Sequence, residues 1–254
     1  MKNENLHRLA VRTASYGSLA CVALLAAGRA AQAQSTQNQS TQNQSSQNLL
    51  IAGGQGSSNA QFAYLGMIAP IAGGTLGHGP FVVPFFGWSR YTFNQNGTEF
   101  TGSEPSGSLG FGYAWTTNVL SVSLSIAGGY SNTTLSPYAP PGAFKGSQWF
   151  AEPQMYAQLK LPAGVTVTGD GGYLTGLRSY FVTSYAQVPV TDAVAVGPEA
   201  DFGGGINYRN QTFGLRVSDR VTPGLTVALT GGAQTNIPGN YRPYFALALS
   251  VPIP

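Results

Sequence analysis

The chain has 254 residues, of which 43% are hydrophobic and only 8% are charged, and its formal net charge is +3. Four of the 12 basic residues and one of the 9 acidic residues lie within the first 33 positions, so the rest of the chain carries eight of each sign. A neutral chain has no general electrostatic attraction for nucleic acid, which excludes that class of partner. The single cysteine, Cys21, also lies in the first segment, so no disulfide or cysteine metal site is expected after it.

Residues 1–33 are predicted to be a secretory signal peptide. The segment begins with basic residues, has an apolar core over residues 19–27, and ends in the small-residue sequence Ala31-Gln32-Ala33. The apolar core is too short to span a membrane, which needs about 20 residues in a helix. We expect cleavage after Ala33.

A low-complexity tract, residues 34–48, follows the signal peptide. It is built on the five-residue repeat Ser-Thr-Gln-Asn-Gln and contains no apolar residue. A segment that has nothing to bury cannot repay the entropy of ordering, so the tract is predicted to be a disordered linker. The remaining residues, 49–254, are predicted to form one β-barrel domain.

The clearest strand signal lies in residues 118–134. Apolar and hydroxyl residues alternate there without error: Leu120, Val122, Leu124 and Ile126 on one side, Ser121, Ser123 and Ser125 on the other. Successive side chains of a strand point to opposite faces, so this stretch predicts a strand with one apolar and one polar face. The same alternation returns at 165–170 and 225–230.

Two all-β architectures satisfy this pattern. In a soluble sandwich or lipocalin-like barrel the apolar face is the core, whereas in an outer-membrane barrel it meets lipid and the polar face lines the lumen. A soluble domain usually has about 25% charged residues, far more than this chain. Sparse charge, abundant glycine and a signal peptide favour an antiparallel transmembrane barrel in the bacterial outer membrane.

Strand-length runs separated by Gly, Pro and Asn predict about twelve strands, with ten as the alternative count. The candidates are 49–56, 61–70, 80–93, 105–116, 118–132, 147–160, 164–174, 178–188, 193–203, 207–218, 224–235 and 241–253. Outer-membrane barrels have long extracellular loops and short periplasmic turns. The long connections, 94–104 and 133–146, are therefore expected outside the cell, and the tight turn at 162–164 in the periplasm.

The alternation also sorts side chains between lumen and lipid. Residues such as Met155 and Leu159 are assigned to lipid. The polar residues predicted to face the lumen are Glu152, Gln154, Tyr156, Gln158, Lys160, Asp170, Glu199, Asp201 and Arg216. Opposite charges are expected to pair across the narrow lumen. Strands 80–93 and 178–188 are apolar on both faces, and the pattern does not orient them.

Catalytic chemistry is not expected. Outer-membrane enzymes use a histidine for proton transfer or beside a nucleophilic serine. After the signal peptide the only histidine is His78, which stands between Gly77 and Gly79 in a predicted turn, with no serine two residues away. Carboxylates are too scattered to form a calcium cage. We expect no catalytic residue, no cofactor and no metal site.

Several motifs resemble those of the bacterial cellulose-biosynthesis BcsS family. The motif residues are Leu135-Ser136-Pro137, then Gly146-Ser147-Gln148-Trp149 after Lys145, then Gly197-Pro198-Glu199, and Tyr208-Arg209. Their order and spacing, together with weaker matches at 62–66 and 111–115, extend the resemblance over about residues 49–254. The family usually has acidic residues after Leu-Ser-Pro, where Tyr138 and Ala139 stand here.

The resemblance implies an outer-membrane barrel without known enzyme chemistry that acts as an accessory component of cellulose biosynthesis or export. Its implied partners are outer-membrane lipid and the cellulose secretion machinery. Two alternatives remain open: a small general pore or structural barrel, and an outer-membrane lipid-modifying enzyme.

Overall fold

The structure, a computed structural model, describes residues 47–95, 97–139, 143, 145–205, 208–235 and 240–253. The predicted signal peptide and linker residues 34–46 lie outside the described residues. The described part of the chain consists of strands, with one short 3-10 turn at Pro162–Gly164. It contains no helix long and apolar enough to cross a membrane.

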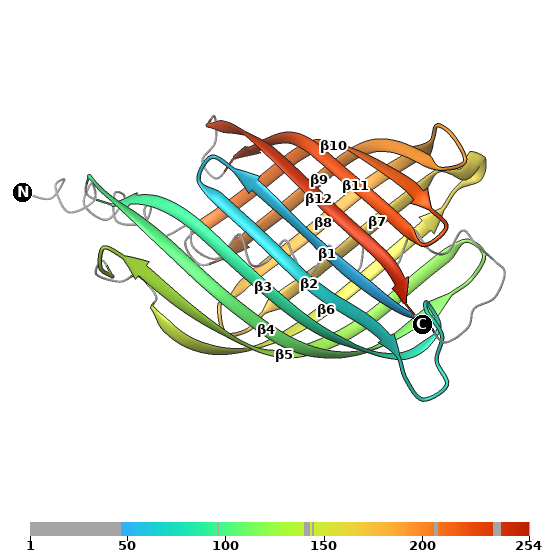
Figure 1. Cartoon of the computed structure of the whole chain (residues 1–254), viewed down its shortest axis with the longest axis horizontal. Coiled ribbons are helices and arrows are strands. Elements are labelled where there is room, and N and C mark those ends of the chain that lie inside the picture. Colours follow the sequence, from blue (N-terminus) through green and yellow to red (C-terminus); the bar gives the residue numbers. More distant parts are fainter. Residues whose placement is uncertain are drawn as a thin grey trace, which may run out of the picture.

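Twelve antiparallel strands close into a barrel (Figure 1). Their bounds are β1 Asn48–Ser57, β2 Ala60–Pro70, β3 Gly79–Gln95, β4 Thr98–Thr116, β5 Leu120–Ser136, β6 Gly146–Lys160, β7 Thr166–Leu174, β8 Ser179–Pro189, β9 Val194–Gly205, β10 Tyr208–Thr222, β11 Leu225–Thr235 and β12 Tyr241–Ile253. Each strand pairs with its neighbours in the chain, and β1 pairs with β12. The predicted all-β barrel of about twelve strands is confirmed.

Strand β1 closes the barrel and brings the number of strands to twelve. It pairs with β12 along its whole length, from Asn48 opposite Ile253 to Ser57 opposite Tyr244, and with β2 on its other side. Without β1, the outer edges of β2 and β12 would present unpaired backbone groups. Such edges are not tolerated in hydrocarbon, so closure by β1 completes the barrel.

The two ends of the barrel differ in their connections. Asn48 and Ile253 lie side by side at one end, called here the terminal end, and the opposite end is called the hairpin end. The connection 137–145 between β5 and β6 lies at the hairpin end, whereas the turn at 162–164 lies at the terminal end. This alternation agrees with the expected arrangement of long and short connections around β5, β6 and β7.

The prediction of a long loop at residues 94–104 is wrong. Strands β3 and β4 continue through it and are joined by residues 96–97 alone, with Asn94 opposite Glu99. Glu99, Thr101 and Ser103 alternate there with buried residues, so polar side chains occupy the outward face. Because this part of β4 extends beyond the apolar belt, it lacks the apolar stripe that marks a strand in the sequence. A connection of eight residues, 71–78, lies instead at the terminal end.

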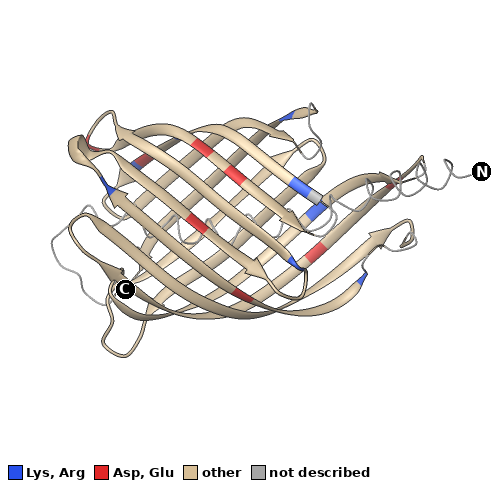
Figure 2. Ribbon diagram, turned by 180° about the vertical axis from the view of Figure 1, so that it is seen from behind, with Lys and Arg blue, Asp and Glu red and all other residues tan. Residues whose placement is uncertain are grey.

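An apolar belt covers the outside of the barrel. Its members are exposed large side chains such as Phe86, Leu109, Phe111, Leu124, Ile126, Met155, Leu215, Leu229 and Phe245. Lys, Arg, Asp and Glu are few along the strands (Figure 2). A continuous apolar exterior of this extent would be a severe aggregation liability in water, whereas it matches the lipid-facing band of a membrane barrel.

Closure also orients the two strands that are apolar on both faces. In β3, Phe85 and Tyr91 are buried and Phe86 is exposed; in β8, Phe181 is buried and Val182 is exposed. Both strands therefore place aromatic side chains inside the barrel. Large apolar residues occupy both faces of these strands. Only the pairing with neighbouring strands therefore determines which of their side chains point into the barrel.

An epitope tag tests the orientation of the barrel. A short tag inserted between Ala139 and Ala143, at the hairpin end, is expected to bind antibody on intact cells, because the longest hairpin connection should face outward. A tag at Ala163, in the turn of the terminal end, should bind antibody only after the cells are opened. Labelling of intact cells through Ala163 alone would show that the barrel is inserted the other way.

Candidate functional site: the barrel interior

The interior has an apolar wall and a polar wall. The apolar wall comes mainly from β1 to β4, where Phe62 stacks on Tyr64 and Tyr64 on Phe85, each pair with ring centroids 5.9 Å apart. The polar wall comes mainly from β5 to β11. Its buried residues include Glu152, Gln158, Thr168, Asp170, Thr183, Gln187, Glu199, Asp201, Thr212, Arg216, Ser218 and Thr230. The barrel thus encloses two chemically different surfaces.

The apolar wall continues to the hairpin end. Phe93 and Phe100 stack at 5.3 Å, and Tyr138 meets the edge of Phe100 with ring centroids 5.2 Å apart. Ala139 and Ala143 pack against the same apolar cluster. The described residues after Leu-Ser-Pro, Tyr138, Ala139 and Ala143, therefore contact the apolar wall. An acidic side chain at position 138 could not make the ring contact with Phe100 that Tyr138 makes.

The predicted lumen residues lie on the inner face. Glu152, Tyr156, Gln158, Asp170, Glu199, Asp201 and Arg216 are at most 6% exposed. Gln154 and Lys160 are half-buried. The residues between them, such as Met155 and Leu159, are exposed on the outside. The period of two along β6, β7, β9 and β10 places these side chains together on the polar wall.

One row of the polar wall runs across five strands. Tyr156 is opposite Asp170, Asp170 opposite Thr183, Thr183 opposite Asp201, and Asp201 opposite Thr212. Neighbouring strands are about 4.8 Å apart, so the five side chains are immediate neighbours. The row alternates carboxylates with hydroxyl groups, a set that hydrogen-bonds polar molecules. Sequence analysis missed Thr183 and Thr212 because single threonines in strands carry no distinguishing signal.

A buried ion pair lies beside this row. Arg216 on β10 donates to Glu199 on β9 at 2.8 Å, and the Thr230 hydroxyl on β11 donates to the same carboxylate oxygen at 3.2 Å. The Arg216 guanidinium also lies 4.7 Å from the ring centroid of Tyr185 on β8. These contacts join four neighbouring strands. The pair joins neighbouring strands along the wall, so for Arg216 and Glu199 the expected pairing across the lumen is wrong, because an adjacent strand offers a nearer partner.

Steric crowding explains the glycine of the Gly-Pro-Glu motif. Gly197 is opposite Arg216, and a Cβ atom at Gly197 would collide with the backbone oxygen of Ala186. Gln187 on β8 donates to the Ser218 hydroxyl on β10 at 2.8 Å, and so crosses over β9. A side chain at position 197 would obstruct this close approach, whereas glycine leaves room for it.

The motif residues outside Gly197-Pro198-Glu199 lie at the hairpin end. Trp149 is opposite Tyr130 and 77% exposed, and their rings meet edge to face at 5.1 Å. Tyr130 donates to the Ser147 hydroxyl at 2.5 Å. Leu135, Ser136 and Pro137 end β5, while Gly146 and Gln148 lie in the first residues of β6. Tyr208 and Arg209 begin β10 at the same end of the barrel. The structure therefore separates the motif into a rim group at the hairpin end and the Gly-Pro-Glu group in the middle of β9.

Two further features bear on chemistry. His78 is exposed, and its backbone pairs with Thr75 across a tight turn. Glu104, which sequence analysis missed, is buried, accepts a hydrogen bond from Thr133 at 3.0 Å, and lines with Glu152 a small cavity of about 20 Å³. Within the described residues, no three His, Cys, Asp or Glu side chains are grouped to hold a metal ion.

A closed antiparallel barrel with an apolar exterior and a polar interior wall is an outer-membrane-type β-barrel. Two solved structures share the fold. The translocator domain of the autotransporter NalP from Neisseria meningitidis has a TM-score of 0.52 and 12% identity, over 91% of this chain and 99% of that one. The COG4313 outer membrane channel from Pseudomonas putida F1 has a TM-score of 0.52 and 11% identity, over 82% and 96%.

The sequence identifies the family within this class. Residues 49–253 match the family described as Cellulose biosynthesis protein BcsS, and the chain belongs to this family. The match covers all twelve strands except the first residue of β1. Among curated proteins, none matches the chain in sequence.

Proposed function

We propose that the protein is a non-enzymatic accessory component of cellulose production in the bacterial outer membrane, where it assists export or anchors the secretion machinery. The family match over residues 49–253 is the observation that carries this proposal. The outer-membrane-type fold supports the location, and the predicted signal peptide supplies the route to it. Membrane lipid and the secretion machinery are the proposed partners.

The chemistry of the interior supports a non-enzymatic role. The polar wall holds carboxylates, hydroxyl groups and one buried arginine, and its best-defined contacts join strands of the wall to one another. His78 is exposed in a turn. This arrangement suits a structural or binding surface better than general acid–base catalysis, which needs a base positioned beside a reacting group.

A deletion strain tests the proposal. Removal of the protein is expected to lower the binding of a cellulose-specific dye to whole colonies, while uptake of a small antibiotic stays at the wild-type level. Reintroduction of the wild-type chain should restore dye binding. Unchanged dye binding, or a permeability change with normal cellulose, would refute the accessory role and favour a general pore.

The pore alternative has one observation in its favour, the polar interior wall. We nevertheless propose that the barrel does not conduct the glucan. Open porins use 16–18 strands and barrels of about eight are filled by side chains, so twelve strands give an intermediate bore. The side chains of both walls are largely buried.

Cello-oligosaccharides in planar bilayers check this prediction. Current through the reconstituted protein is expected to be the same with and without added cello-oligosaccharide. Maltose-series oligosaccharides of equal length serve as the size control. Concentration-dependent block by cello-oligosaccharides alone would show that glucan enters the bore.

A further inference from the structure

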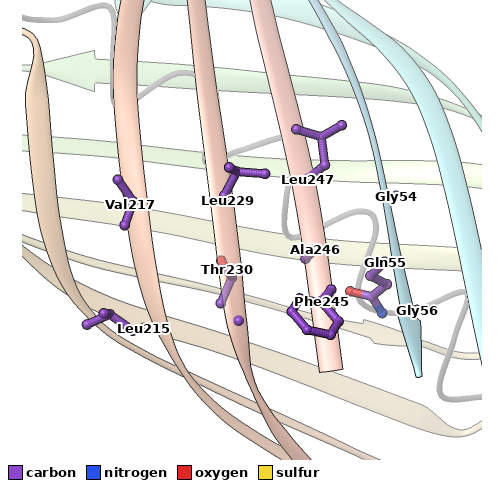
Figure 3. A pocket seen from close by; sticks show the side chains of 11 residues that line it. Gly54, Gln55, Gly56, Leu215, Val217, Leu229, Thr230, Phe245, Ala246 and Leu247 are labelled. Carbon is purple, nitrogen blue, oxygen red and sulfur yellow. The ribbon is translucent and has the colours of Figure 1, made fainter. Parts of the chain in front are cut away.

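We infer that a groove on the outer wall, at the seam where the barrel closes, binds one acyl chain of an anionic membrane lipid. The groove has a volume of about 690 Å³ and crosses β10, β11, β12 and β1 (Figure 3). This volume lies within the range of about 300–1,000 Å³ that is typical of small-ligand sites. The inference rests on the membrane-barrel fold and is independent of the cellulose role.

Missing side chains produce the hollow. Gly56 on β1 is opposite Phe245 on β12, Phe245 is opposite Gly231 on β11, and Gly231 is opposite Leu215 on β10. Glycine therefore alternates with a large apolar residue across the seam. Phe245 is 69% exposed and Leu215 is 56% exposed, so both rise above the glycines and bound the groove.

The lining determines the occupant. No charged residue contributes to it, and its outward-pointing side chains, those of Leu215, Val217, Leu229, Phe245 and Leu247, are hydrocarbon. The side chains of Gln55 and Thr230 make their hydrogen bonds with Tyr244 and Glu199 in the interior. Water in such a hollow would lack hydrogen-bond partners. A hydrocarbon chain gains dispersion contacts with several sides of a concave wall, more than it gains on the convex wall elsewhere. Because this face of the barrel contacts membrane lipid, the hydrocarbon chain that reaches the groove is a lipid acyl chain.

A positive charge selects the head group. Arg209 is exposed on the outer face of β10, in the same alternation as Phe213 and Leu215. It lies six residues from Leu215 toward the hairpin end, a distance of about 20 Å along a strand. An arginine at the rim binds phosphate oxygens through charge-assisted hydrogen bonds. Arg209 and the groove together fit a lipid whose phosphate lies at the rim and whose chain lies along the seam.

Two glycines make the test possible. A Cβ atom at Gly231 would meet only ring atoms of Phe245, at 3.7 Å and 3.8 Å, and a Cβ atom at Gly128 on the outer face of β5 would meet nothing within 4 Å. Gly231→Leu fills the groove and Gly128→Leu adds the same side chain elsewhere on the lipid-facing wall. Gly56→Leu, with one backbone oxygen at 3.9 Å, fills the groove from β1.

The measurement is native mass spectrometry of the full mature chain in detergent, titrated with phosphatidylglycerol or phosphatidylcholine. Gly231→Leu should bind phosphatidylglycerol roughly tenfold more weakly than wild type, equivalent to the lost burial of about two methylene groups. Gly128→Leu should bind as wild type does. Arg209→Gln should remove the preference for phosphatidylglycerol over phosphatidylcholine and retain chain binding.

Heat-dependent gel migration identifies variants that fold. If Gly231→Leu does not fold, Gly56→Leu provides the same comparison. Wild-type affinity in a folded groove-filling variant, or an equal loss in Gly128→Leu, would overturn the groove. Equal binding of the two lipids by wild type would overturn the role of Arg209.

Discussion

Replacement of Arg216 by alanine is expected to destabilise the barrel by about 3–5 kcal/mol. Glu199 is 3% exposed, and its carboxylate accepts hydrogen bonds from Arg216 and Thr230. Removal of the guanidinium leaves a buried negative charge without its positively charged partner, and also removes the contact with the Tyr185 ring. The measurement is the temperature at which the folded band on a gel, or its circular dichroism, is lost.

A matched control distinguishes the effect of losing the ion pair from the effect of losing an arginine side chain elsewhere. Arg90 is exposed on β3, so Arg90→Ala should unfold near the wild-type temperature. The double variant Glu199→Gln/Arg216→Met should be more stable than Arg216→Ala, because it removes both charges and keeps most of the buried volume. Equal unfolding temperatures for Arg216→Ala and Arg90→Ala would show that the pair contributes nothing.

Substitution of Gly197 by valine is expected to prevent the barrel from folding. A Cβ atom at this position would collide with the backbone oxygen of Ala186 on β8. Overpacking usually costs about 1–3 kcal/mol when side chains can move aside. Here the obstacle is backbone, so β8 and β9 must move apart and lose the strand pairs that flank the site, Tyr185 opposite Glu199 and Val188 opposite Val196. The expected result is loss of the heat-modifiable band and of the protein from the membrane fraction.

Gly128→Val is the control for this experiment. Gly128 lies on the outer face, and a Cβ atom there would meet nothing within 4 Å. It makes the same change in a strand of the same barrel and should fold as wild type does. A folded Gly197→Val barrel with wild-type thermal stability would contradict the close approach of β8 and β9.

Gly197 and the Glu199–Arg216 pair together explain why the Gly-Pro-Glu motif has these residues. Gly197 lets β8 and β9 approach, and Glu199, two residues later on the same face, holds Arg216. Pro198 between them is exposed on the outside. Three consecutive residues thus serve packing, the lipid-facing wall and the buried ion pair. The rim group around Trp149 lies at the hairpin end, where an exposed aromatic residue is accessible to a partner or to the membrane interface.

Local alternation was sufficient to predict much of this protein. Period-two patterns in the stretches that became β5, β6 and β9 assigned the inner and outer faces, since the direction of a side chain in a strand depends only on its position along the strand. The motif residues, read in order, indicated the family, and the family match covers residues 49–253.

Only the tertiary structure decided the rest, because the deciding contacts join distant residues. The strands with large apolar residues on both faces, β3 and β8, received their orientation from neighbouring strands. Arg216 meets Glu199 through the β9–β10 register. The groove brings Gly56 beside Phe245, at opposite ends of the barrel sequence. Such neighbours exist only once the sheet has closed, and alternation along a single strand carries no information about them.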